Sequence, residues 1–340
     1  MSTTKPWLGA AAVVPAALAA LLYLLYARTF TPTPDVDAAV VEAEGGRLLT
    51  LPDGRKAEFF EFGAANADSE VMLYFPGYTL SGSSARSWDD VCRARNVRLL
   101  GISMAGWGAS SPQRGRAFAD AGRDALAVVA HLGLGDAPLH IVGVSFGAGN
   151  AAATAALCPE RVASLSLLIP AWPSMLTHDA WRGAPFVHRM TGKPVLDRLW
   201  QYYVAPRLDI PSLLAALAPR DWADFVAVMP PDAVAGMTRE LRRSTRFHSE
   251  GACDGMRLLR EGGRALAAER DALAALGARV AIFWAEDDQL APAHHDEFLA
   301  RWLPGARAFP RPGGHLSLFT RLEPFLDAAL APPPRVQSLR

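Results

Sequence analysis

Short runs of β-favouring residues alternate with helical stretches along most of this sequence, and this alternation limits the possible folds more than any single motif does. Strand-like runs lie at residues 71–75, 97–103, 139–144, 162–169, 279–284 and 307–309, with helical patterns at 83–94, 116–132, 146–157, 293–302 and 321–330. Strands that alternate with helices form a mostly parallel sheet covered on both faces. We therefore predict an α/β fold with a mostly parallel central sheet flanked by helices. Pro52-Asp53-Gly54, between two apolar runs, predicts a β-hairpin before the first of these strands.

The alternation is interrupted once, by a long helical stretch rich in aromatic residues and punctuated by prolines. Connections inside α/β units are usually much shorter than this stretch. We therefore predict a helical cap at residues 171–277, inserted late in the sheet, which divides the core domain into residues 46–170 and 278–331. A separate domain is the alternative, although its flanking strands would still have to pair. Residues 332–340 are expected to form a loose tail.

The N-terminal segment has a different composition, because residues 6–27 carry no charged side chain. A helix needs about 20 apolar residues to span the hydrocarbon core of a bilayer. We predict a single transmembrane anchor at residues 6–28, with the lipid bilayer as its partner, and an extended linker at residues 29–45.

A cleaved signal peptide is the alternative interpretation of this segment. Its small-residue cleavage site, Ala17-Leu18-Ala19, precedes the most apolar run instead of following it, which favours an anchor. Two positive charges, Lys5 and the N-terminal amine, precede the apolar segment, and only Arg28 follows it closely. Because positive charge favours the inner side of a membrane, this distribution predicts an N-terminus on the inside and a main domain on the outside.

Charge and cysteine content exclude several other classes of protein. The 340 residues include 34 basic and 34 acidic side chains, so no charge excess is available for a nucleic-acid backbone, and we expect no nucleic-acid partner. Cys92, Cys158 and Cys253 are too widely spaced for a zinc motif or a disulfide framework. We expect no metal and no cofactor.

Ser145 is the first candidate for chemistry. It stands between Gly143 and Gly147, directly after the predicted strand 139–144 and directly before the predicted helix 146–157. A turn this tight leaves little room for Cβ atoms beside its central residue, so the two glycines would leave the serine projecting above the sheet. Because the carboxyl ends of strands gather the functional loops of an α/β sheet, this position predicts a nucleophile.

A serine hydroxyl needs a base to remove its proton, and His315 is the predicted base. It follows the last predicted strand, outside the cap, whereas the other histidines lie in helical patterns, at the start of a strand or in the cap. Those seven are His131, His140, His178, His188, His248, His294 and His295.

A carboxylate should orient the imidazole, and two backbone amides should hold the developing oxyanion. Three acids, Glu286, Asp287 and Asp288, follow the strand at 279–284, and their spacing alone leaves the choice among them open. The amide of Phe146, next to the nucleophile, is one predicted oxyanion donor. The amide of Tyr78, in the loop after the strand at 71–75, is the other.

Taken together, these segments resemble the α/β-hydrolase family over about residues 46–330. Residues 143–147 resemble the family's nucleophile elbow, 75–82 its oxyanion loop, and 313–319 its histidine loop. Residues 103–111 resemble its D-x-R-G-x-G-x-S segment, with Ser103 where an aspartate is common; in the oxyanion loop, Pro76 stands in place of the usual histidine. In the family's acid loop the acid stands four residues before a proline, so the resemblance selects Asp288.

The resemblance implies a serine hydrolase with the triad Ser145, Asp288 and His315 and with a cap that covers the substrate. We expect a membrane-anchored enzyme that cleaves an acyl bond, such as a carboxylic ester of low polarity, through an acyl-enzyme. The low polarity is suggested by the anchor and by apolar residues of the predicted cap, namely Trp172, Met175, Trp181, Phe186 and Met190. An acyltransferase or a perhydrolase-like relative is one alternative. A non-catalytic binding protein is another, although degenerate members of the family usually lose a triad residue.

Overall fold

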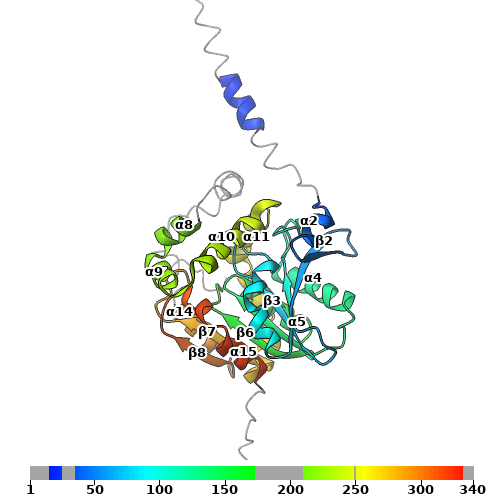
Figure 1. The fold of residues 1–340 in the computed structure, drawn as a ribbon, viewed down its shortest axis with the longest axis vertical. Coiled ribbons are helices and arrows are strands. Elements are labelled where there is room, and N and C mark those ends of the chain that lie inside the picture. The colour runs from blue at the N-terminus through cyan, green and yellow to red at the C-terminus, as the bar shows by residue number, and fades with distance from the viewer. Residues whose placement is uncertain (1–14, 25–34, 173–209, 249, 292, 332–340) are drawn as a thin grey trace, which may run out of the picture. The chain divides into compact units, whose positions relative to one another are not determined.

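An eight-stranded sheet forms the centre of the structure and confirms the predicted α/β architecture (Figure 1). The computed structural model describes residues 15–24, 35–172, 210–248, 250–291 and 293–331. The strand order is β1-β2-β4-β3-β5-β6-β7-β8. The pairs β1–β2 and β2–β4 are antiparallel, and all pairs from β4 through β8 are parallel.

The strands and helices of this unit follow one another in the predicted alternation. The strands are β1 (Gly46–Thr50), β2 (Lys56–Gly63), β3 (Glu70–Phe75), β4 (Val97–Ile102), β5 (Leu139–Val144), β6 (Val162–Leu168), β7 (Val280–Ala285) and β8 (Arg307–Arg311). The α-helices outside the predicted cap are α2 (Ala38–Glu42), α3 (Asp89–Arg93), α4 (Phe118–His131), α5 (Gly147–Leu157), α14 (Ala293–Trp302) and α15 (Glu323–Leu330). The 3-10 helices are η1 (Gly82–Trp88), η5 (Gly277–Arg279) and η6 (Ser317–Thr320).

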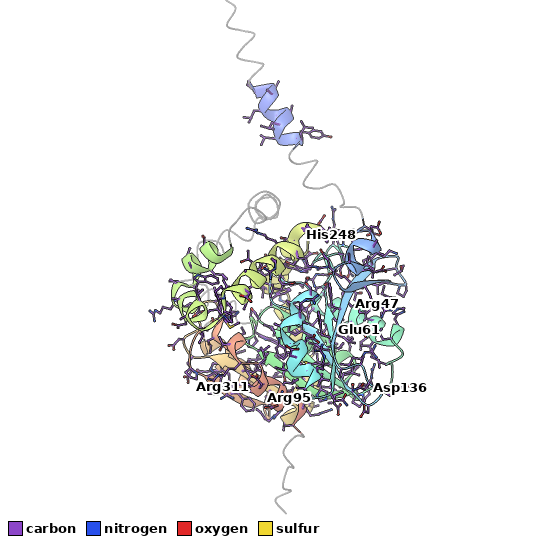
Figure 2. The ribbon with its side chains drawn as sticks, in the orientation of Figure 1. Arg47, Glu61, Arg95, Asp136, His248 and Arg311 are labelled. Carbon is purple, nitrogen blue, oxygen red and sulfur yellow. The ribbon has the colours of Figure 1, made fainter. Side chains whose placement is uncertain are left out.

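The predicted hairpin is present as β1 and β2. Gly46 pairs with Phe60 in its register, and the Arg47 and Glu61 side chains, both labelled in Figure 2, form an ion pair of 2.8 Å across it. Because β2 also pairs with β4, this hairpin extends the parallel sheet at one edge.

Two predictions about local structure were right only in part. The helix predicted at residues 83–94 is the 3-10 helix η1 followed by the short helix α3. The hydroxyls of Ser84 and Ser87 bond the carbonyl oxygens three residues earlier, which favours the tighter turn. The linker predicted as extended at residues 29–45 contains helix α2, where the Asp37 side chain accepts a hydrogen bond from the Ala39 amide and caps the first turn.

Successive side chains of the strands point to opposite faces of the sheet, and each face has its own core. On one face Leu73, Ile141 and Ile282 pack with helices α4, α5 and α14. On the other face Met72, Val142 and Phe283 pack with η1, α3 and α15. The strands from β3 to β7 are therefore buried on both sides, which explains why they are almost entirely apolar in sequence.

Between β6 and β7, the elements in the described part of the chain are helical. They are α8 (Ile210–Leu217), α9 (Pro219–Val228), α10 (Pro231–Arg246), α11 (Glu250–Glu261), α12 (Gly263–Ala268) and α13 (Arg270–Ala275), together with η5. Helices α8 to α11 lie together at one end of the core (Figure 1). We refer to this insertion, residues 171–277, as the cap.

Residues 1–34 form a unit separate from residues 35–340. In its described part, residues 15–24 form a helix whose side chains are exposed. Within the residues that the structure describes, no helix has both the length and the apolar character that a membrane crossing requires. The predicted transmembrane helix is thus not found there, and residues 6–14 and 25–28 of the predicted anchor lie outside the described residues.

Candidate active site

Ser145 occupies a strained turn between β5 and α5. Its φ of 50° lies in the left-handed region, which residues with a Cβ atom adopt only when their surroundings impose it. A Cβ atom added at Gly147 would lie 2.1 Å from the Phe75 carbonyl oxygen, and one at Gly143 would lie 2.6 Å from the Ala148 Cα. Both glycines are therefore required by close packing, as the spacing around Ser145 predicts.

Backbone hydrogen bonds hold this turn against the next strands. The Ser145 amide donates to the Leu168 carbonyl at 2.8 Å, and the Ala171 amide donates to the Ser145 carbonyl at 3.0 Å. The Ile169 amide in turn donates to the Phe283 carbonyl on β7 at 2.7 Å. The turn after β5 is thus bonded to the end of β6 and to the segment that follows it, and that segment is bonded to β7.

His315 and Asp288 form a buried pair in the loops that follow β8 and β7. The His315 Nδ1 and the Asp288 Oδ2 are 2.7 Å apart. The other carboxylate oxygen of Asp288 accepts the amides of Leu290 and Ala291, both at 2.7 Å. A carboxyl oxygen facing Nδ1 favours the tautomer with the proton on that nitrogen, which leaves Nε2 as the nitrogen available as a base.

Of the three acids that the sequence leaves open, Asp288 is the one bonded to the histidine. Glu286 and Asp287 are exposed, and the backbone explains why: their amides pair with the carbonyls of Arg311 and Gly313, which turns the loop so that Asp288 points inward.

The surroundings of His315 favour its protonated form. Burial lowers the pKa of the imidazole, but the charge of Asp288, its hydrogen bond and a further contribution from Asp221 outweigh burial and hold that pKa above its ordinary value. The site can therefore stabilise an imidazolium, which is what a histidine becomes after it removes a proton from a serine.

Ser145 and His315 are not hydrogen-bonded to each other in the described part of the chain. They follow strands of one parallel sheet, β5 and β8, and emerge at the same edge of it. Such catalytic hydrogen bonds are often long without substrate and shorten only in the reacting complex. The structure thus joins Asp288 to His315 and leaves the contact with Ser145 open.

The loop after β3 lies against the serine. A Cβ atom added at Gly77 would be 3.6 Å from the Ser145 Cβ, so Gly77, which precedes Tyr78, lies close to Ser145. The rings of Tyr78 and Phe146 meet edge to face with centroids 6.0 Å apart. The two residues whose amides the sequence suggests as oxyanion donors therefore lie next to each other.

Glu58 is a charged residue at this edge that the sequence analysis missed. It is 0% exposed on β2, and the Ser103 hydroxyl donates to its Oε2 at 2.5 Å. The Ser103 Oγ also accepts the Gly82 amide at 2.9 Å. Where the family commonly has an aspartate, this chain thus has a serine together with a carboxylate from the neighbouring strand. A glutamate within an apolar strand was the only sequence signal.

Asp221 is the second missed carboxylate, and it comes from cap helix α9. It is 1% exposed, and its Oδ2 accepts the His315 amide at 3.0 Å. Its sequence neighbourhood resembles an ordinary amphipathic helix, so no local pattern distinguishes it.

No metal site is found in the part of the chain that the structure describes. There, no three His, Cys, Asp or Glu side chains come together in a way that could hold a metal ion.

Comparison with known proteins gives the class to which this fold corresponds. Residues 70–199 match the model of the alpha/beta hydrolase fold. The structure resembles that of a hydrolase from Pseudomonas aeruginosa PA01, with a TM-score of 0.61 and 22% identity over 85% of this chain and 98% of that chain. It also resembles an esterase from Exiguobacterium antarcticum, with a TM-score of 0.60 and 19% identity over 84% of this chain and 100% of that one.

A bromoperoxidase from Bacillus anthracis has a similar structure as well, with a TM-score of 0.63 and 14% identity over 84% of this chain and 98% of that chain. No sequence among curated proteins matches this chain. The resemblance to the α/β-hydrolase fold family, first drawn from motifs, is confirmed, and the chain has the α/β-hydrolase fold.

Proposed function

We propose that this protein is a membrane-anchored serine hydrolase that cleaves a carboxylic ester of low polarity. Ser145 is the nucleophile, His315 the general base and acid, and Asp288 the residue that orients His315. The amides of Tyr78 and Phe146 hold the oxyanion. The observation that carries this proposal is the strained Ser145 turn at the same sheet edge as the buried His315–Asp288 pair.

The reaction follows from the chemistry of these groups. The His315 Nε2 takes the proton from the Ser145 hydroxyl while the oxygen attacks the ester carbonyl. The resulting oxyanion accepts hydrogen bonds from the two amides, each worth about 10²–10³ in rate. The intermediate collapses when the imidazolium protonates the leaving alcohol. Water, deprotonated by His315, then attacks the acyl-enzyme and releases the acid and the free serine.

The preference for low polarity is supported by the half-buried ring of Tyr78, in the loop next to Ser145. This ring meets Trp107 edge to face at 5.4 Å and Phe146 at 6.0 Å, and those two partners are buried in the core. Among the cap residues that first suggested this preference, Trp172 packs in the core against Trp302 and so does not carry it. The others, Met175, Trp181, Phe186 and Met190, lie outside the described residues.

Labelling with a fluorophosphonate probe tests the nucleophile and the base. Wild type should label, and Ser145→Ala and His315→Ala should abolish labelling, whereas Ser87→Ala, at an exposed serine, should leave it intact. Labelling that survives Ser145→Ala would place the nucleophile elsewhere. A series of neutral esters should show turnover that rises with acyl length, and fastest turnover of short polar esters would contradict the substrate class.

Transfer of the acyl group to an acceptor other than water is a second candidate. The likeness to a bromoperoxidase structure favours it, since that protein shares the fold. Product analysis with added alcohols or hydrogen peroxide distinguishes the two: a hydrolase releases mostly the free acid, and a transferase forms mostly the new ester or peracid.

Anchoring is the remaining part of the proposal. Residues 6–28 span the membrane once, with the N-terminus inside and the catalytic unit outside. The absence of charge from residues 6–27 supports the span, and the distribution of basic residues around it supports the orientation.

A further inference from the structure

Asp221 connects the cap to both loops of the His315–Asp288 pair. Its Oδ2 accepts the His315 amide at 3.0 Å and the Gln289 amide at 3.3 Å. Gln289 is the neighbour of Asp288 in sequence, so one carboxylate oxygen joins the loop that carries the acid to the loop that carries the base.

The connection runs in both directions. The Gln289 Oε1 accepts the Arg220 amide at 3.0 Å and the Asp221 amide at 3.5 Å, at the first turn of α9. These amides have no partner within their own helix, so the acid loop caps the helix that supplies Asp221. Helix α9 therefore cannot leave this position without breaking bonds to both loops.

The approach of Asp221 depends on a glycine. A Cβ atom added at Gly314, directly before His315, would lie 1.6 Å from the Asp221 Oδ1. Any other residue at position 314 would displace the carboxylate or the histidine loop. The glycine before His315 thus makes room for a side chain of the cap.

Two carboxylates consequently face His315. Asp288 bonds the ring, and Asp221 bonds the backbone amide of the same residue. Burial raises the pKa of Asp221, and the nearby charge of Asp288 adds to this, while the amides of His315 and Gln289 oppose it. In its ionised form Asp221 adds negative charge beside the imidazole.

The structure assigns Asp221 as a positioning residue that holds His315 and Asp288 in register and makes docking of the cap a condition for a correctly placed base. This assignment rests on the proposed function, since it concerns the same histidine. It goes beyond the triad because the residue comes from the inserted cap and acts through the backbone of His315 without touching substrate.

Substitutions at residue 221 separate its geometry from its charge. Asp221→Asn keeps an oxygen that can accept both amides, so kcat should stay within about five-fold of wild type. The acid limb of the kcat/KM profile should move to lower pH, because the negative charge is lost. Asp221→Ala removes the acceptor, and kcat should fall about 10- to 100-fold at unchanged KM, the usual cost of misplacing a catalytic group by about 1 Å. Asp224→Ala, at an exposed site of the same helix, should change neither.

Each kcat is calculated per active site. The active sites are counted from the final extent of labelling by the fluorophosphonate probe. A residue with a merely structural role would lower the number of sites and leave kcat per site unchanged, and that result would overturn the assignment. Equal losses for Asn and Ala would overturn it as well, since the Asn variant retains the acceptor.

Hydrogen exchange of the backbone tests the same assignment without activity. In Asp221→Ala the amide of His315 should exchange faster than in wild type or Asp224→Ala, as measured on peptides that cover this loop. Unchanged exchange would overturn the assignment whatever the rates show. Failure of the proposed function is recognised separately, by labelling of Ser145→Ala at the level of wild type.

Discussion

Ser145 combines an unfavourable backbone conformation with a half-buried position at the end of β5. A left-handed conformation at a residue other than glycine costs about 1–3 kcal/mol, and the surrounding structure must offset this cost. Here the bonds of Ser145 to Leu168 and Ala171 and the close contacts of Gly147 impose the conformation. Local strain of this kind, at the end of a strand in the same parallel sheet whose loops carry a buried His–Asp pair, supports the proposed chemistry.

Asp288→Asn should alter both the rate and its pH dependence. His315 acts as a base only when neutral, so kcat/KM should rise with pH through a pKa held above the ordinary 6.5. Without the charge of Asp288, burial dominates and lowers that pKa, so the acid limb should move to lower pH. The loss of kcat should be about 10³- to 10⁴-fold.

Steady-state kinetics on a neutral ester across the pH range measures both effects. Asp287→Asn, at the exposed neighbouring acid, serves as the matched control and should behave as wild type. An equal loss in the control, or an acid limb that moves to higher pH in Asp288→Asn, would contradict the role of Asp288.

Helix α10 of the cap is held to the hairpin strand β2 by a buried ion pair. The Arg243 Nη2 lies 2.6 Å from the Glu58 Oε1, with the side chains 10% and 0% exposed. The same arginine bonds Glu44 and the Ser81 hydroxyl, and its guanidinium lies over the Phe60 ring at 4.8 Å. Removal of one partner from such a pair leaves a buried charge without compensation.

Arg243→Met should therefore lower the free energy of unfolding by about 3–5 kcal/mol. Arg246→Met removes the partly exposed pair with Glu44 on the same helix and should cost no more than about 1 kcal/mol. Urea denaturation of the compact unit of residues 35–340, followed by circular dichroism, measures both. Equal losses in the two variants would show that the Glu58–Arg243 pair is not the main attachment of α10.

The two units of the chain differ in how far they bury their apolar side chains. Residues 35–340 contain the whole sheet and its two cores, whereas the described helix at residues 15–24 exposes Leu18, Leu21 and Leu22 by more than half. Apolar side chains without a protein partner favour contact with lipid or with another apolar surface. Insertion of the proposed anchor into a bilayer would cover these leucine side chains.

The full chain should remain in the membrane pellet after carbonate extraction, and a chain that begins at Asp35 should be released. Leu21→Arg should release part of the protein, because a charged residue near the centre of a spanning helix costs about 2.5–3.5 kcal/mol. Leu21→Ile is the matched control and should stay in the pellet. Complete release of the unaltered chain would contradict the anchor.

The order of strands and helices, and the positions of Ser145 and His315 at strand ends, could be predicted without coordinates. These features depend on local propensity, on the period of apolar residues and on glycines that a tight turn requires. Strand boundaries agree within about two residues, an accuracy expected where apolar runs end at turn residues. The exceptions are η1 and α2. Both are stabilised by hydrogen bonds between the backbone and side-chain hydroxyl or carboxylate groups, which the period of apolar residues does not reveal.

The contacts that complete the site could not be predicted in this way. Local spacing leaves the three adjacent acids equivalent, and it is the resemblance to the family's acid loop that selects Asp288, which the path of the loop after β7 turns toward His315. Glu58 meets Arg243 across 185 positions, and Asp221 meets His315 across 94. Such pairs depend on how the cap docks on the core, which local patterns do not record. Periodicity thus encodes which elements form and which faces they bury, whereas the pairing of distant charges is decided only when the elements pack.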